Sequence, residues 1–133
     1  MTDAKQPLTL PDRENAAVEF KTTLSDSRKI IETIAAMATI GGGTIWVGVR
    51  PDGTPVGCEL GEGELERLVQ RILAATDPKV YVTLDDPEHE GQRLLRIQVP
   101  AGDGAHLAYG RAFHRVGPAT VAMTRDEYER RLV

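Results

Sequence analysis

The 133-residue sequence predicts an α+β fold, in which a mixed, mainly antiparallel β-sheet packs with two main helices plus a C-terminal helix. Three observations predict it. Two segments carry apolar residues at the spacing of an amphipathic helix, several short segments alternate apolar and polar residues as strands do, and a helix-start signal lies close to the C-terminus. The resulting order β-α-β-β-α-β-β-β-α is typical of a sheet covered by helices.

The chain begins with a segment of low apolar content. Residues 1–13 contain two prolines, and we expect a flexible N-terminal arm there, followed by a single domain over 14–133. The segment "AVEFKT" at 17–22 alternates apolar and polar residues, which predicts a short strand.

A helix near residues 25–39 is predicted by apolar residues at helical spacing, namely Ile30, Ile31, Ile34, Met37 and Ala38. Ser25 or Ser27 is suited to cap its first turn. The glycines at 41–43 follow this helix, precede a strand and have no lysine after them, so they do not match a phosphate-binding loop. We interpret them as a helix stop and a close backbone crossing.

The middle of the chain continues with a strand and a turn. "TIWVGV" at 44–49 is nearly all apolar, as in a strand buried on both faces. "RPDG" at 50–53 has the composition of a turn, and 54–60 would return as the partner strand of a hairpin. The stretch 61–78 has one apolar face and predicts a second amphipathic helix, closed by an Asp-Pro pair.

The C-terminal third predicts further strands and the last helix. Residues 79–86 and 92–100 alternate as strands, and 107–117 is expected to be extended. Thr124 and Glu127 have the spacing of a capping box, so the last helix is expected to start at about 124 and to run toward the chain end.

Charge is unevenly distributed along the chain. The net charge is −4, and residues 1–49, 50–90 and 91–133 carry about −1, −6 and +3. No apolar run approaches the roughly 20 residues that span a bilayer, so no membrane association is expected. The single cysteine, Cys58, excludes an internal disulfide. These features predict a cytoplasmic protein whose positive charge gathers in the C-terminal third.

Three stretches, in their order and spacing, resemble the Schlafen-type AlbA-like domain family. They are "ENAAVEFK" at 14–21, "AAMATIGGGTIWVGVRPDGTPVG" at 35–57 and "HLAYGRAFHRVGPATVAMTRDE" at 106–127. The family pattern combines an E-x4-E-F-K opening, a helix ending in a small-residue and GG turn, an apolar strand ending in I-G-V, and a late R-x-G-S-like turn. The resemblance implies the AlbA-like fold and DNA or RNA binding. It also raises metal-dependent RNA cleavage, which some eukaryotic Schlafens perform with two glutamates and an aspartate.

The resemblance suggests a catalytic and metal-binding cluster of carboxylates. Glu14 and Glu19 match the paired glutamates of the opening motif, and Asp52 is the available third carboxylate. Converging carboxylates could hold Mg²⁺ or Mn²⁺ and activate water against a phosphodiester. However, Arg50 and Pro51 stand where the family has its aspartate. The alternatives are a solvated Glu14, a Glu19 paired with a basic neighbour and an Asp52 that belongs to a turn.

A second group of candidates is basic and aromatic. Arg111, Phe113 and Arg115 share one face of an extended segment, an arrangement that suits phosphates with a base or sugar on the ring. Lys21 shares a face with Glu19 and could pair with it or contact a phosphate. The alternative is that Phe113 enters the core and the arginines meet the acidic middle segment.

We therefore expect a DNA- or RNA-binding domain, regulatory in role, that binds through the basic C-terminal segment and requires no cofactor. A metal-dependent endoribonuclease and a protein-assembly module are the alternatives. The Schlafens that the chain resembles enclose nucleic acid between two facing lobes, and this chain has one lobe, which predicts a homodimer.

Overall fold

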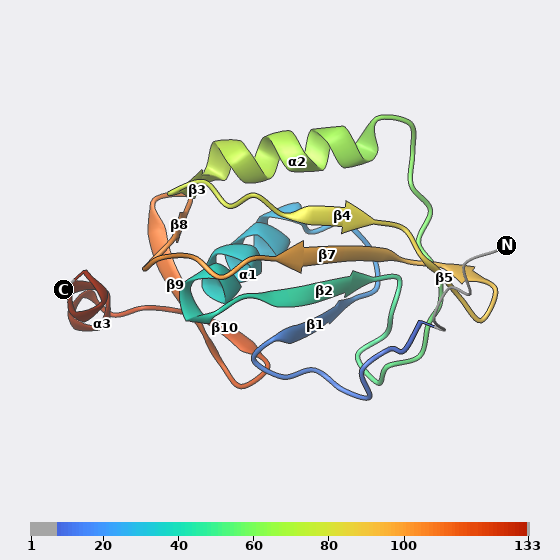
Figure 1. Ribbon diagram of the computed structural model, residues 1–133, viewed down its shortest axis with the longest axis horizontal. Coiled ribbons are helices and arrows are strands. Elements are labelled where there is room, and N and C mark those ends of the chain that lie inside the picture. Colours follow the sequence, from blue (N-terminus) through green and yellow to red (C-terminus); the bar gives the residue numbers. More distant parts are fainter. Residues whose placement is uncertain (1–7, 133) are drawn as a thin grey trace, which may run out of the picture.

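The computed structural model describes residues 8–132 and shows a mixed sheet beside a central helix (Figure 1). The strand order of this sheet is β1-β2-β7-β4. β1 is parallel to β2, and the other neighbours are antiparallel. The α+β fold predicted from the sequence is thereby confirmed. The four strands are β1 (Val18–Lys21), β2 (Gly43–Val47), β7 (Leu95–Val99) and β4 (Thr83–Asp85).

A second four-stranded sheet lies on the other side of the central helix, where the sequence predicted only one sheet. Its order is β10-β9-β8-β3, and every neighbouring pair is antiparallel. These strands are β3 (Thr76–Asp77), β8 (Leu107–Ala108), β9 (Arg111–Val116) and β10 (Ala119–Ala122). A small hairpin of β5 (Glu88–His89) and β6 (Gln92–Arg93) completes the strands of the described chain.

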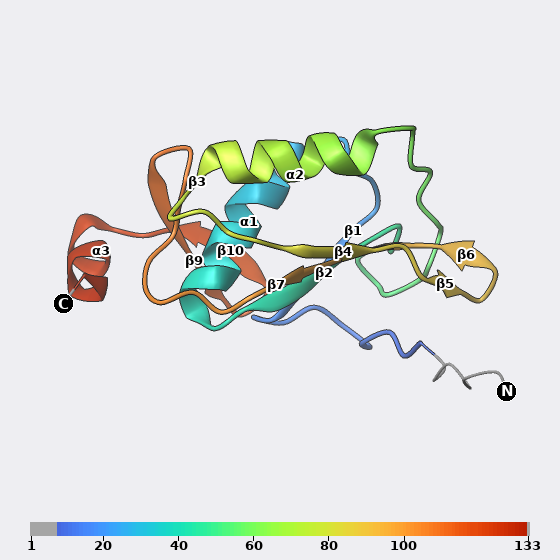
Figure 2. The ribbon, with the colours of Figure 1, turned by 45° about the horizontal axis from the view of Figure 1, so that its top comes forward.

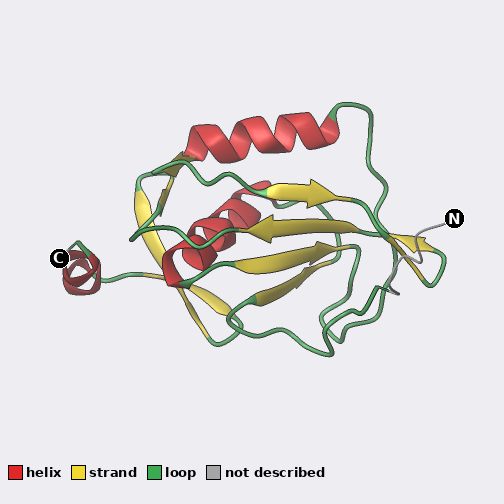
Figure 3. Cartoon of the chain, in the orientation of Figure 1, coloured by secondary structure: helices red, strands yellow, loops and turns green. Residues whose placement is uncertain are grey.

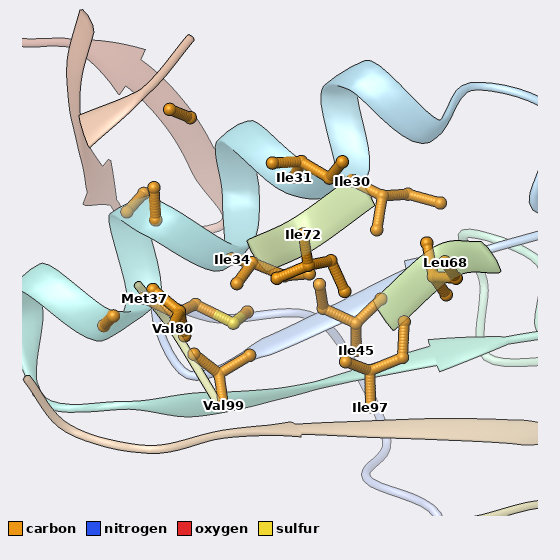
Figure 4. Close-up of a cluster of buried hydrophobic side chains, with 14 of the residues drawn as sticks. Ile30, Ile31, Ile34, Met37, Ile45, Leu68, Ile72, Val80, Ile97 and Val99 are labelled. Carbon is orange, nitrogen blue, oxygen red and sulfur yellow. The ribbon is translucent and has the colours of Figure 1, made fainter. Parts of the chain in front are cut away.

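The central helix α1 (Ser27–Ile40) is buried on nearly all sides. Every residue from 30 to 39 except Glu32 is buried, and β9 and β2 contact it from the two sheets. A helix that is apolar around its circumference is stable only inside a core, and Figure 4 shows its isoleucines meeting side chains of β2, β7 and α2. The cap is Asp26, whose carboxylate accepts a hydrogen bond from the Lys29 N–H, and not Ser25 or Ser27.

The two further helices differ in how far they are buried against the rest of the domain. α2 (Glu64–Ala75) lies beside α1 on the same face of the first sheet (Figure 2) and buries only Leu68 and Ile72. α3 (Arg125–Arg131) projects from one end of the molecule (Figure 3) and buries no residue. The predicted capping box is present, because the Thr124 side chain accepts from the Glu127 N–H and the Glu127 carboxylate accepts from the Thr124 N–H.

The opposite face of the first sheet is covered by the N-terminal segment (Figure 2). Leu8 and Leu10 pack there against a small apolar cluster formed by Phe20, Trp46, Val49 and Leu94. The described part of the predicted arm, residues 8–13, therefore contributes to the packing of this face and is not free. Residues 1–7 lie outside the described chain.

The glycines after α1 make the helix stop and close crossing that the sequence predicts. Gly41 ends the helix with φ 124°, and its N–H donates to the carbonyl of Met37. A Cβ at Gly42 would lie 2.7 Å from the Val99 carbonyl oxygen, and one at Gly43 would lie 2.7 Å from the Met37 sulfur. The chain therefore passes the β7 backbone and the Met37 side chain of α1 at distances that a side chain at Gly42 or Gly43 would prevent.

Further sequence-based expectations differ from the structure. The predicted return strand at 54–60 is a loop with a single bridge between Val49 and Pro55. The strand predicted at 79–86 is reduced to β4, and β10 was not predicted. None of the helices in residues 8–132 is long and apolar enough to cross a membrane.

Candidate functional site

Arg115 is buried and holds together two distant parts of the fold. Its side chain is 0% exposed, and Nη1 lies 3.1 Å from Glu19 Oε1. Nη2 donates to the carbonyls of Asn15 at 2.7 Å and Val18 at 3.2 Å, while Nε donates to the carbonyl of Ala16 at 3.2 Å. The planar guanidinium thus fixes the start of β1 to β9, a task that its fork of donors suits.

Phe113 is also inside the protein, in the main core cluster. The sequence-based expectation that Arg111, Phe113 and Arg115 form one exposed face is therefore wrong in its geometry. The three residues do share a face, but that face of β9 is directed at α1 and β1 and not at solvent. Only Arg111 is exposed, with its guanidinium 5.9 Å from the centre of the Phe113 ring.

The three candidate carboxylates do not converge. Glu14 accepts a hydrogen bond from the Phe20 N–H at 2.9 Å, and Glu19 is the partner of Arg115. Asp52 is a turn residue that accepts from the Thr54 N–H at 2.9 Å, and hydrogen bonding from the Thr54 side chain, followed by that from its N–H, lowers the pKa of Asp52. Among residues 8–132, no three His, Cys, Asp or Glu side chains are arranged to hold a metal ion.

Lys21 lies beside the buried pair, as one of the sequence-based alternatives expected. Its Nζ is 3.3 Å from Glu19 Oε2. Together with Lys29 and Glu32 it lines a polar hollow of about 250 Å³. The positive charge of Lys21 is therefore partly neutralised by Glu19.

Tyr109 is an exposed aromatic residue that the sequence reasoning missed. It forms the two-residue turn between β8 and β9 with Gly110, and both have positive φ, 53° and 77°. Such a turn favours Asn or Gly at its first position. A tyrosine there carries strain, and the guanidinium of Arg28 on α1 lies 4.1 Å from the centre of its ring.

Exposed arginines surround this tyrosine. Arg71 on α2 donates to the Ser27 hydroxyl at 3.2 Å, and Arg67 lies one turn earlier on the same helix. Arg111 follows the turn directly and pairs with Ala108 across the hairpin. Within the described chain, neither Arg67, Arg71 nor Arg111 forms an ion pair.

These residues form one continuous region. Arg67 and Arg71 line a hollow of about 220 Å³, and Arg71 and Tyr109 line a pocket of about 440 Å³. We call the region the arginine–tyrosine surface and define it as Arg28, Arg67, Arg71, Tyr109 and Arg111. Its one visible signal in the sequence is the Tyr-Gly pair between two extended segments, because the arginines come from three elements that only the fold brings together.

The chain is similar to known proteins in sequence family and in fold. Residues 14–124 match the family model described as Schlafen, AlbA_2. The DIP2311 protein from Corynebacterium diphtheriae has a similar structure, with a TM-score of 0.66 and 25% identity over 85% of this chain and 23% of its own. The N-terminal domain of a RecG-related protein from Nitrosomonas europaea has a TM-score of 0.57 and 24% identity, over 68% of this chain and 66% of its own.

The chain thus spans about a quarter of the first structure and two thirds of the second. A search of curated proteins finds no match. Because the family model covers most of the sequence, including the first two motif stretches and most of the third, the chain belongs to the Schlafen AlbA_2 family.

Proposed function

We propose that this domain binds nucleic acid through the arginine–tyrosine surface. The observation that carries the proposal is an exposed tyrosine stacked under Arg28 beside three exposed arginines without ion-pair partners. Arginine guanidinium groups bind phosphates in a bidentate manner, and aromatic rings stack on bases. Membership of the Schlafen AlbA_2 family supports a role with nucleic acid in general terms. The similar Nitrosomonas domain supports it in the same way, because it belongs to a protein named as related to the ATP-dependent DNA helicase RecG.

The proposed interface differs from the one expected from the sequence. Arg111 remains part of it, while Phe113 and Arg115 are used inside the fold. Arg67 and Arg71 lie one helical turn apart on α2, so both guanidinium groups can reach phosphates of one strand. The acidic residues of the middle segment keep the footprint small, which predicts weak, salt-sensitive binding.

Binding of a labelled oligonucleotide should weaken steeply with salt, and this measurement tests the proposal. We expect the log-log slope against salt to be about −0.9 per neutralised phosphate on duplex and about −0.7 on single strands. The double variant Arg67→Gln/Arg71→Gln should bind more weakly and with a shallower slope. Fluorescence anisotropy with DNA and with RNA would measure both quantities.

The matched control is Arg125→Gln/Arg130→Gln, which removes the same charge from α3, a projecting helix that contributes no residue to the surface (Figure 1). Equal loss of affinity in both double variants would indicate a general charge effect and contradict the proposed surface. Unchanged binding in the α2 variant would do the same.

The same mixtures, with Mn²⁺ or with a chelator, test the nuclease alternative. We expect the nucleic acid to remain intact, because Glu14 and Glu19 are engaged in structural contacts and Asp52 stabilises its own turn. Cleavage that requires Mg²⁺ or Mn²⁺ and is lost in Asp52→Asn would contradict this expectation.

Assembly into a homodimer remains our proposal for how a single lobe makes a longer groove. β10 is an edge strand of its sheet and carries the exposed Val121, and edge strands are ready sites for pairing with a second copy. A second copy would double the number of arginines available to one nucleic acid. Light scattering should give twice the chain mass of 14.5 kDa, and a monomer mass with nucleic acid present would contradict the dimer.

A further inference from the structure

A pocket adjoins Tyr109 at the point where α2 ends. Its lining includes small or apolar side chains, Ala74, Ala75 and Leu107, which we call the apolar floor, and polar side chains, Arg71, Asp77 and Tyr109, which we call the polar rim. The volume of about 440 Å³ falls in the range of roughly 300–1,000 Å³ that is usual for small-molecule sites. This combination of apolar floor and polar rim is typical of a ligand site.

We propose that this pocket receives one unpaired base of a single-stranded nucleic acid, so that the domain prefers single strands to duplex. The inference rests on the proposed function and specifies the substrate class of the same surface. A base in a duplex is stacked on both sides and cannot enter a pocket, whereas a base of a single strand can be splayed out.

The strained turn is an independent observation in favour of the proposal. Tyr109 has φ 53°, where a bulky residue is unfavourable and Asn or Gly would be easier to accommodate. The residue is 38% exposed, so core packing does not explain the tyrosine. Arg28 covers one face of the ring, and a stacked base requires only the other. Strain of this kind gathers at sites that bind ligands.

The rim indicates what kind of base would fit. Arg71 can hold the neighbouring phosphate while the base lies on the apolar floor. The Asp77 carboxylate accepts N–H donors and repels carbonyl oxygens. Cytosine, adenine and guanine carry an exocyclic amino group, and thymine and uracil carry carbonyls in its place. The pocket therefore favours an amino-bearing base.

The turn chemistry allows a variant that removes the ring without harming the fold. Tyr109→Asn converts the turn to Asn-Gly, the pair that such hairpin turns prefer. Tyr109→Phe keeps the ring as a matched control. A second, independent variant, Ala74→Leu, fills the pocket from α2, where leucine is a good helix former. Gln70→Leu adds the same side chain to an exposed position of α2 that does not line this pocket.

The test compares two labelled DNA single strands of about 12 nucleotides, a length within the usual range of single-strand sites. One consists of cytosine and adenine, and the other has a central run of abasic sites with the same phosphates. We expect the intact strand to bind roughly 5- to 150-fold more tightly, the range of one stacking contact. Tyr109→Asn and Ala74→Leu should remove the difference, whereas both control variants should keep it. A thymine strand should bind more weakly than the cytosine–adenine strand, and Asp77→Asn should narrow that gap.

The outcomes separate the inference from the proposed function. Equal binding of the intact and abasic strands by the wild-type domain would overturn the base pocket and leave the arginine–tyrosine surface standing. Loss of the difference in Tyr109→Phe or Gln70→Leu as well would also overturn it. Binding of neither strand would overturn the proposed function and the inference with it.

Discussion

Replacing Arg115 by methionine is expected to lower the free energy of unfolding by about 3–5 kcal/mol, the cost of removing one partner from a buried ion pair. The Glu19 carboxylate would stay buried with only Lys21 beside it, and the backbone carbonyls of residues 15, 16 and 18 would lose the hydrogen bonds that the guanidinium donates. Methionine approximates the length of the side chain, so the effect reports mainly the lost charge and hydrogen bonds. Urea denaturation monitored by circular dichroism would measure it.

The matched control is Arg111→Met, four residues earlier on the same strand and exposed. Substitutions at exposed positions of this kind change the free energy of unfolding by about 0.5 kcal/mol or less. In the double variant Arg115→Met/Glu19→Met, the loss should be smaller than the sum of the single losses, because no unpaired charge remains. Similar stability of Arg115→Met and Arg111→Met would contradict the structural role of Arg115.

The second large effect on stability is expected at Gly42, where the chain after α1 passes close to β7. Gly42→Ala should destabilise the domain by about 2–4 kcal/mol, since a Cβ at positive φ and overpacking each carry a cost. Gly42 has φ 96°, and its added Cβ would lie 2.7 Å from the Val99 carbonyl oxygen, which belongs to backbone and cannot rotate away. Thermal unfolding followed by calorimetry would show the change.

Gly41→Ala separates the two causes. Gly41 also has a positive φ, 124°, but nothing lies within 4 Å of its added Cβ. We therefore expect only the strain contribution, about 1–2 kcal/mol. An equal loss at both positions would show that the close approach of Gly42 to β7 contributes nothing.

The fold could be predicted from the sequence wherever a local pattern was strong. The isoleucine spacing located α1, and the Thr124–Glu127 pair located the start of α3. The prediction of a return strand after residue 53 was wrong, because a turn signal does not show whether the chain that follows pairs with the strand before the turn. β10 was missed because Ala119 and Thr120 show little contrast between faces, and its partner β9 was needed to define it.

For the site, the sequence identified residue types but not the direction in which they point. Alternation correctly placed Arg111, Phe113 and Arg115 on one face, yet alternation does not tell which face of a strand is buried. Tyr109 stands out because its φ is positive and because Arg28 of α1, which is distant in sequence, covers its ring. No sequence pattern shows either feature. Glu19 matched the family motif, but its engagement by Arg115 depends on tertiary contacts.

The contacts of Arg115 also affect how the domain can fold during synthesis. Its hydrogen bond to Asn15 joins residues 100 positions apart. In the same way, β9 packs against α1, which is synthesised long before β9. Long-range contacts of this kind slow folding, because the loop between them must close first. Until β9 and β10 have been translated, the apolar surface of α1 that they cover stays exposed, and the start of β1 lacks its hydrogen bonds to Arg115. A nascent chain therefore completes the core of this domain only when β9 and β10 emerge, and partly folded chains with uncovered apolar surface are prone to aggregate.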